Sequence, residues 1–453
     1  MNIHFIAIGG AAMHNLALAL QRAGHTITGS DDEIFDPAKT RLKNAGLLPE
    51  SEGWFPEKLN AGIDAIVLGM HAKADNPELK RAKELGLRIY SYPEYLFEVW
   101  KDKKRIVVGG SHGKTSITSM IMHAFKTLGF QADYMIGALA PGFENTVNIS
   151  KDAEVAVMEG DEYTASILDL RPKFHLYKAN VGIISGIAWD HINVFPTYEN
   201  YLLQFSLFID SMEPNATLIY NADDAEVLKL SLSHPRTDIT KIPYRVPSYL
   251  VRDEQFTVEV GGKHYPLDVF GKHNLSNLAA ACEAAKYCGI SEADFWSASQ
   301  NFTGAANRLE LLAKGKHGVC YKDFAHSPSK VQATLAAFCE RYGQRKVSAC
   351  FELHTYSTLN ADFLPGYAGS LQGANRAAVY YNPHTLELKR MPPLDPDFVR
   401  RCFGREDLEI ITDGNTLEGF IRGSASDNSA LLLMSSGNWG GLNVKALAAE
   451  ICE

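Results

Sequence analysis

Apolar and polar positions in the N-terminal part of the chain follow the alternation of strands and helices. The mostly apolar run Ile3–Ile8 leads through Gly9-Gly10 into Ala12–Gly24, where apolar positions recur at helical spacing. A second short strand is expected at Thr26–Ser30, and the acidic pair Asp31-Asp32 follows it. This strand–helix–strand order, with a glycine turn and an acid after the second strand, is typical of a Rossmann-like domain.

The same alternation continues through the middle of the chain. Arg105–Val108 is predicted to be a strand and Ile117–Leu128 a helix, with the turn Gly109–Ser116 between them. From Phe256 to Phe270, apolar and polar residues alternate around Gly261-Gly262, as in an antiparallel ribbon. Further strands are expected at Val155–Met158, Val181–Ser185 and Thr217–Tyr220.

A third alternating region begins near Arg308. Its predicted strands, which have helices between them, are Gly318–Lys322, Val347–Phe351, Ala377–Tyr381 and Ala430–Met434. A chain of 453 residues is too long for one compact core, so several domains are expected. The pattern therefore predicts an α/β protein with three domains in series, at residues 1–102, 103–305 and 306–453.

Composition and charge narrow the function classes. With 46% hydrophobic residues, 21% charged residues and no apolar run of membrane-spanning length, the chain has the composition of a soluble protein. The formal net charge of -9 and the lack of a block of Lys or Arg argue against nucleic acid or an anionic membrane as the partner. The N-terminus shows no signal-peptide pattern, and the seven cysteines include no C-x-x-C pair. We therefore expect a cytoplasmic protein, a monomer or a weak homodimer, that binds small molecules.

The sharpest local signal is the turn after the strand Arg105–Val108. A glycine-rich loop between a strand and a helix, ending in Gly-Lys-Thr-Ser, is typical of a phosphate-binding loop. Lys114 is expected to reach the β- and γ-phosphates of a nucleotide, and the Thr115 hydroxyl to bind Mg²⁺. A plain turn is the alternative, but it gives little reason for this residue order. The predicted nucleotide-binding residues of the loop are Gly110, Ser111, His112, Gly113, Lys114, Thr115 and Ser116.

Two acidic clusters follow later strands of the same domain. The cluster Glu159–Glu162 comes directly after Val155–Met158, where an acid that binds a metal is needed beside a phosphate loop. Asp190-His191 comes shortly after Val181–Ser185. Solvated loop acids and a structural histidine are the alternatives, because Mg²⁺ prefers oxygen ligands. The residues alone leave this choice open.

Six motifs, taken in order, resemble those of a known family. They are Gly110–Ser116, Glu159, Asp190-His191, Gly271–Asn277, Arg308 and Asp323–Pro328. Together they resemble the Mur ligase family of peptidoglycan enzymes over essentially the whole chain. The resemblance implies a ligase that uses ATP and Mg²⁺ to activate a carboxylate as an acyl phosphate and joins it to an amine. It also implies a Rossmann-like N-terminal domain for a UDP-sugar, a central P-loop ATPase domain, and a Rossmann-like C-terminal domain for the amine.

The resemblance implies roles for several residues of the central domain and its border. Lys114, His191 and Arg308 are expected to be catalytic, with Arg308 on the transferring phosphate. Thr115, Glu159 and His191 are expected to hold the metal. Some relatives place a carbamylated lysine after the Asp-His motif, but the first lysine after His191 is Lys229. The metal is therefore expected to be held without such a group.

Substrate contacts are also implied by the resemblance. Asn274 and Asn277 are expected to reach the adenine, and Asp323 the ribose. Because the amine must lose a proton before it attacks, a base is needed, and His326 is our candidate; packing of a turn is the alternative role. The expected contacts to the UDP-sugar are Gly9, Gly10, Ala11, Met13, Asp31, His71, Arg171 and Lys173.

Within the family, the chain resembles the branch whose acceptor is UDP-N-acetylmuramate. Asp161–Tyr163, Asp169–Phe174 and Met434–Gly441 resemble a ligase that recycles the tripeptide L-Ala-γ-D-Glu-meso-diaminopimelate more than one that adds L-alanine in de novo synthesis. Near Phe351–Thr355, an arginine usual in the family is lacking. We predict the recycling reaction, with the L-alanine reaction as the first alternative. A non-catalytic ATP-binding regulator and other amide ligases, such as polyglutamate synthases, are further alternatives.

Overall fold

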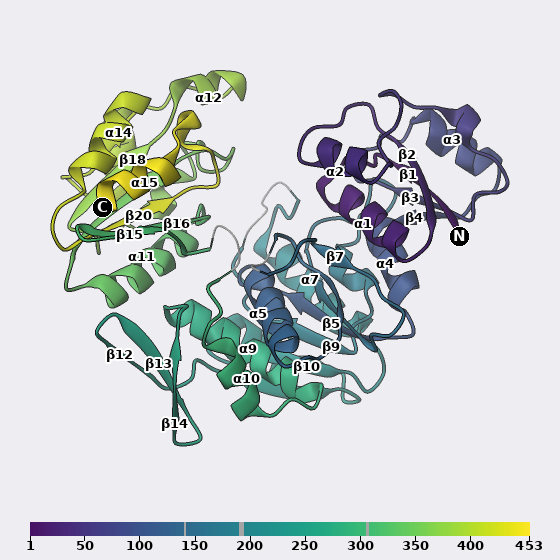
Figure 1. The fold of residues 1–453 in the computed structure, drawn as a ribbon, viewed down its shortest axis with the longest axis horizontal. Coiled ribbons are helices and arrows are strands. Elements are labelled where there is room, and N and C mark those ends of the chain that lie inside the picture. Colours follow the sequence, from purple (N-terminus) through teal and green to yellow (C-terminus); the bar gives the residue numbers. More distant parts are fainter. Residues whose placement is uncertain (140–141, 190–193, 305–307) are drawn as a thin grey trace. The chain divides into compact units, whose positions relative to one another are not determined.

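A computed structural model of the protein describes residues 1–139, 142–189, 194–304 and 308–453. Figure 1 shows the helices and strands of the chain, which forms two compact units. The first unit contains residues 1–246 and 276–299, and the second contains residues 247–275 and 300–453. Among the described residues, every helix is too short or too polar to cross a membrane.

The N-terminal part of the first unit contains a parallel sheet with the strand order β2-β1-β3-β4. Its strands are β1 (Asn2–Ile6), β2 (Thr26–Ser30), β3 (Ala65–Leu68) and β4 (Ile89–Ser91). Its α-helices are α1 (Ala11–Arg22), α2 (Ala38–Asn44), α3 (Pro77–Glu84) and α4 (Tyr92–Trp100). The expected strand–helix–strand start is confirmed. It places the turn Ala7–Gly10 at the carboxyl end of β1 and the start of α1.

The rest of the first unit contains a seven-stranded sheet with the order β11-β10-β9-β5-β8-β6-β7. All neighbouring strands are parallel except β6 and β7. Its strands are β5 (Lys104–Gly109), β6 (Asp133–Met135), β7 (Val147–Asn148), β8 (Val155–Glu159), β9 (Val181–Ile184), β10 (Thr217–Asn221) and β11 (Thr240–Tyr244). The α-helices of this region are α5 (Lys114–Thr127), α6 (Lys173–Leu176), α7 (Tyr198–Ser211), α8 (Ala225–Ser233), α9 (Lys272–Tyr287, which begins in the second unit) and α10 (Glu292–Ser299).

Strand β5 lies between β8 and β9 in this sheet. Residues Ile106–Val108 of β5 and the apolar face of α5 are fully buried or nearly so, which fixes the loop that joins them. The parallel register also brings the carboxyl ends of the three strands to one edge of the sheet. The turn after β5 and Glu159 at the end of β8 are therefore neighbours.

The second unit contains an antiparallel ribbon and a six-stranded sheet with the order β15-β16-β20-β17-β18-β19. The ribbon consists of β12 (Tyr249–Arg252), β13 (Gln255–Val260) and β14 (Lys263–Leu267). The sheet consists of β15 (Glu310–Lys314), β16 (Gly318–Asp323), β17 (Lys346–Glu352), β18 (Arg376–Tyr380), β19 (Glu409–Ile411) and β20 (Ser429–Met434). Its α-helices are α11 (Pro328–Tyr342), α12 (Pro383–Leu388), α13 (Pro396–Phe403), α14 (Gly414–Gly423) and α15 (Val444–Cys452).

The sequence-based strands of the second unit are confirmed, and the α/β fold class is correct. The ribbon is also present, with Gly261-Gly262 at its predicted turn, and β12 is an additional strand that the alternation did not indicate. Short 3-10 turns lie at Pro56–Lys58, Leu364–Tyr367 and Trp439–Gly441. The seven cysteines are free thiols, and five of them are buried.

Candidate active site

The phosphate loop has the backbone geometry that its sequence predicts. Gly113 has a φ of +81° and precedes Lys114, the first residue of α5. A β-carbon at Gly113 would collide with Oδ1 of Asn277, which lies on α9 and is only 8% exposed. Only glycine is therefore accommodated where the loop turns into the helix. The predicted adenine contact Asn277 thus lies directly against the loop.

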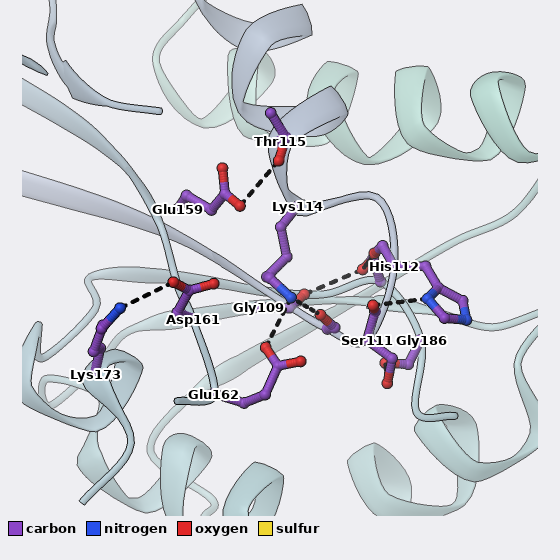
Figure 2. Close-up of polar contacts among 12 residues, drawn as sticks. Gly109, Ser111, His112, Lys114, Thr115, Glu159, Asp161, Glu162, Lys173 and Gly186 are labelled. Atoms are coloured by element: carbon purple, nitrogen blue, oxygen red, sulfur yellow. Dashed lines mark hydrogen bonds and ion pairs between the residues drawn. The ribbon is translucent and has the colours of Figure 1, made fainter. Parts of the chain in front are cut away.

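Lys114 points from the start of α5 toward an acidic residue (Figure 2). Its ammonium donates to the Gly110 carbonyl at 2.8 Å and to Glu162 Oε2 at 2.7 Å. Glu162 is 1% exposed, so the ion pair is buried. Burial disfavours the charged ammonium, but the carboxylates of Glu162, Asp161 and Glu159 outweigh this effect and raise the pKa of Lys114. The amine is therefore held protonated and ready to bind an anionic phosphate.

Tyr201 is a residue at this site that the sequence did not indicate. It is fully buried on α7, and its hydroxyl lies 2.8 Å from Ser111 Oγ and 3.4 Å from Glu162 Oε1. The Ser111 hydroxyl also accepts the N–H of Ala188 at 2.8 Å. The base of the phosphate loop is thus fixed by one polar network. Glu162 belongs to the predicted acidic cluster, but no local signal indicated its contacts with Lys114 and Tyr201.

Thr115 and Glu159 lie together at the predicted metal position. The Thr115 hydroxyl donates to Glu159 Oε1 at 3.0 Å (Figure 2). Glu159 Oε2 accepts the backbone N–H of Gly137 at 2.7 Å. Glu159 is 8% exposed; burial and the nearby Asp161 raise the pKa of its carboxyl. A buried carboxylate beside a hydroxyl offers the hard oxygen ligands that Mg²⁺ prefers, so the residues fit that cation.

His191, the third predicted metal ligand, lies outside the described residues. Within residues 1–139, 142–189, 194–304 and 308–453, no group of three or more His, Cys, Asp and Glu side chains has the geometry of a metal site. Thr115 and Glu159 are therefore the part of the predicted metal site that the structure brings together.

The predicted UDP-sugar loop follows β1. The backbone N–H of Gly9 donates to Asp31 Oδ2 at 2.7 Å, so the acid after β2 holds the glycine turn. Burial raises the pKa of Asp31 to about 6; the Gly9 bond opposes this rise and the neighbouring Asp32 adds to it. Met13 is buried on α1, whereas Ala11 is exposed at its first turn. These residues form one end of the N-terminal sheet.

A polar chain links this loop to the seven-stranded sheet. His14 Nδ1 lies 2.9 Å from the Gly10 carbonyl, and burial lowers the pKa of its ring. Arg41 donates to His14 Nε2 at 3.3 Å, to Asn15 Oδ1 at 2.7 Å and to Asn145 Oδ1 at 2.8 Å. Asn145 shortly precedes β7, so Arg41 joins the two sheets of the first unit. The sequence did not indicate Arg41.

The other predicted sugar contacts lie elsewhere on the first unit. His71 is exposed just after β3. Arg171 is exposed and forms a two-pronged ion pair with Asp169, from Nε to Oδ1 at 3.0 Å and from Nη2 to Oδ2 at 2.6 Å. Lys173 begins α6 and pairs with Asp161 at 3.1 Å, which places it at the acidic cluster (Figure 2). Their contacts with a sugar nucleotide stay predictions.

The remaining predicted residues belong to the second unit. Asn274 is buried and donates to the Phe270 carbonyl at 2.9 Å. The Arg308 guanidinium lies 4.8 Å from the centre of the Phe324 ring. Asp323, at the end of β16, accepts the N–H groups of Leu309 and Ala325, each at 2.7 Å. Asp323 therefore fixes the residue after Arg308, and this bond was not evident from sequence.

His326 lies in the same turn, and its Nδ1 is 2.9 Å from the Phe324 carbonyl. If Nδ1 carries the proton, Nε2 is the basic nitrogen of the ring. The ring also packs edge-on against Phe324, as the alternative structural role requires. Its role as a base stays a prediction.

Comparison with known proteins places this geometry in a family. The Mur ligase family catalytic-domain model matches residues 2–104, and the Mur ligase middle-domain model matches residues 108–285. A UDP-N-acetylmuramate–L-alanine ligase of Caldicellulosiruptor saccharolyticus is 30% identical over 84% of this chain and 83% of its own. The chain belongs to the Mur ligase family.

Members with different amine substrates are similar to this Mur ligase. The UDP-N-acetylmuramate–L-alanyl-γ-D-glutamyl-meso-2,6-diaminoheptandioate ligase of Escherichia coli is 25% identical over 99% of this chain and 98% of its own. The crystal structure of a UDP-N-acetylmuramate–alanine ligase from Thermotoga maritima has a TM-score of 0.69 and 20% identity, and covers 97% of this chain and 96% of its own. That structure supports the fold. The chain is thus an ATP-dependent ligase of the Mur type.

Proposed function

We propose that this Mur ligase joins the amino group of L-Ala-γ-D-Glu-meso-diaminopimelate to the carboxylate of UDP-N-acetylmuramate, in peptidoglycan recycling. The phosphate loop carries the proposal. Lys114 lies at the start of α5, and the Thr115 hydroxyl lies 3.0 Å from the buried carboxylate of Glu159. This arrangement suits ATP and Mg²⁺, with Lys114 on the phosphates and Thr115 and Glu159 on the cation. Bound there, Mg²⁺ would offset phosphate charge.

The chemistry requires a carboxylate to become an electrophile. Lys114 and Arg308 are proposed to offset the charge of the γ-phosphoryl group as it is transferred to a carboxylate oxygen. The product is an acyl phosphate, which has a far better leaving group. The amine then forms a C–N bond with the acyl carbon as phosphate leaves. Because each stage concentrates negative charge, preorganised donors supply the main stabilisation.

The domain roles are part of the proposal. Residues 1–102 are proposed to bind the UDP-sugar through the loop after β1, where Gly9, Gly10 and Asp31 lie. Residues 103–305 are proposed to bind ATP, with Asn274 and Asn277 of α9 near the adenine. Residues 306–453 are proposed to bind the amine. The sugar-binding roles of Ala11, Met13, His71, Arg171 and Lys173 are proposed with them.

The choice of amine rests on charge. In free L-alanine a carboxylate lies beside the amine, whereas in the tripeptide the carboxyl of L-Ala is part of an amide bond. A site for free L-alanine therefore needs a cation beside the amine pocket. The segment 353–358 after β17 contains no Lys or Arg, and the buried carboxylate of Glu352 precedes it.

The test measures phosphate release from purified protein with ATP, Mg²⁺ and UDP-N-acetylmuramate. The amine is either the tripeptide or L-alanine at matched concentrations. The proposal predicts kcat/KM at least about tenfold higher with the tripeptide, the effect of about 1.4 kcal/mol of differential binding. The opposite preference would establish the L-alanine reaction, the second candidate, which the 30% identical relative favours.

A further inference from the structure

Four neighbouring strands of the second unit end at the same edge of its sheet. The register pairs Asp323 of β16 and Phe351 of β17 with Met434 of β20, and Glu352 with Tyr380 of β18. Chain order and spatial order diverge here, because β20 lies between β16 and β17. In open α/β sheets, ligands bind at the carboxyl ends of the strands beside such a change of strand order.

Glu352 is a buried carboxylate at this edge of the sheet that the proposed phosphate chemistry does not use. It is 3% exposed and accepts hydrogen bonds from the Ser435 hydroxyl and from the backbone N–H of Trp439, the latter at 3.1 Å. Both donors belong to the glycine-rich turn after β20. The carboxylate thus fixes this turn through Oε2, which leaves Oε1 directed to another partner.

That partner is His354, two residues further along the chain. Its Nδ1 lies 3.9 Å from Glu352 Oε1, and its side chain is 34% exposed. A β-carbon at Gly437 would lie 2.5 Å from Cγ of His354, so the glycine lets the turn approach the ring. A carboxylate facing Nδ1 favours the tautomer with hydrogen on Nδ1, which makes Nε2 the basic nitrogen.

We propose that the Glu352–His354 pair is a catalytic base that takes the proton from the incoming ammonium group. The inference rests on the proposed function and names residues of the C-terminal domain that act on the amine. Glu352 is the positioning residue, because it acts through the ring. His354 is the group that meets the substrate.

The proton balance of this step is complete. The ammonium group gives one proton to Nε2 of His354, which becomes an imidazolium beside the Glu352 carboxylate. The nitrogen lone pair forms the C–N bond with the acyl carbon. After this bond forms, the nitrogen gives its second proton to the departing phosphate oxygen. The C–O bond to phosphate breaks, and its electron pair leaves with inorganic phosphate, which carries that proton. The imidazolium then loses its proton to water.

The surroundings of Glu352 contain both signs of charge. Burial raises the pKa of Glu352, and hydrogen bonds from Ser435 and Trp439 oppose that rise. His354 and Lys322 of β16 also lower the pKa of Glu352. The pKa of Tyr380 is raised mainly by burial and further by the Glu352 carboxylate. The Glu352 carboxylate therefore lies where little water screens its charge.

The test compares two nucleophiles on the same full-length enzyme. Hydroxylamine is already unprotonated at neutral pH, so it traps an acyl phosphate as a hydroxamate without a base. With ATP, Mg²⁺ and UDP-N-acetylmuramate, His354→Gln should lower peptide amide formation about 10²- to 10⁴-fold and leave hydroxamate formation within about twofold of wild type. Glu352→Gln, which still accepts both turn hydrogen bonds, should show a smaller loss of the same kind.

The chain offers two matched variants. His384 and Glu387 on α12 form an exposed pair 3.2 Å apart, so His384→Gln should change neither product. His326→Gln tests the other candidate base in the same assay. Equal loss of amide and hydroxamate in His354→Gln, or no loss of either, would overturn the proposal. A wild-type enzyme that forms no hydroxamate would instead contradict the proposed function.

Discussion

Replacing Lys114 should lower the stability of the folded protein as well as stop ATP turnover. Its ammonium lies 2.7 Å from Glu162 Oε2, and the two side chains are 12% and 1% exposed. Lys114→Met keeps most of the apolar stem but removes the charge that faces a buried carboxylate. Breaking a buried ion pair from one side costs about 3–5 kcal/mol. For a domain of this size, that loss corresponds to a melting temperature lower by about 6–20 °C.

The assay is thermal unfolding followed by fluorescence, with Lys101→Met as the matched control. Lys101 pairs with Glu98 at 2.8 Å, but the side chains are 47% and 30% exposed, so the control should lose at most about 1 kcal/mol. The double variant Lys114→Met with Glu162→Gln should recover part of the loss, because no buried charge then lacks its partner. A Lys114→Met protein with the same melting temperature as the Lys101→Met control would refute this reasoning. The activity of Lys114 variants should therefore be measured at a temperature at which they stay folded.

Three further outcomes are expected. Thr115→Ala and Glu159→Gln should each raise the Mg²⁺ concentration for half-maximal activity at least about tenfold, measured by magnesium titration at saturating ATP; an unchanged requirement would place the cation elsewhere. In steady-state kinetics, Arg41→Ala and Asn145→Ala should each lower kcat with little change in the KM for ATP. The double variant should have a kcat no lower than that of Arg41→Ala alone. Additive decreases in kcat would show that the two side chains do not act through one contact. Because burial raises the pKa of Asp31 to about 6, the folded protein binds the carboxyl proton of Asp31 more tightly than the unfolded chain does. The free energy of unfolding, measured by urea titration, should therefore fall as pH rises from about 4 to about 6. Asp31→Asn should make this pH dependence weaker.

Local patterns predicted the elements of the fold and the residues at their ends. The phosphate loop was evident because strand, glycine turn and helix are consecutive in the chain. Helix α5 begins at Lys114 rather than at the predicted Ile117, because Gly113 completes the turn in a left-handed conformation. Strand β12 was missed because Tyr249–Arg252 is only four residues long and gains its partners from β13.

Contacts between distant segments were not accessible in the same way. Ser111 and Tyr201 are 90 residues apart, Arg41 and Asn145 are 104 apart, and Glu352 and Ser435 are 83 apart. Each contact depends on how strands order within a sheet and how helices pack on it. Ordinary residue types at these positions carry no local signal. The sequence therefore indicated which acids surround the phosphate loop but not which of them pairs with Lys114.

The most direct test of the central claim follows an oxygen atom. UDP-N-acetylmuramate labelled with ¹⁸O in its carboxylate is incubated with the enzyme, ATP, Mg²⁺ and the tripeptide, and the released phosphate is analysed by mass spectrometry. Activation as an acyl phosphate predicts one ¹⁸O atom in each phosphate formed, because the carboxylate oxygen leaves with the phosphoryl group. Phosphate without the label would show that ATP is hydrolysed by water, and would contradict the account of this chain as a carboxylate–amine ligase.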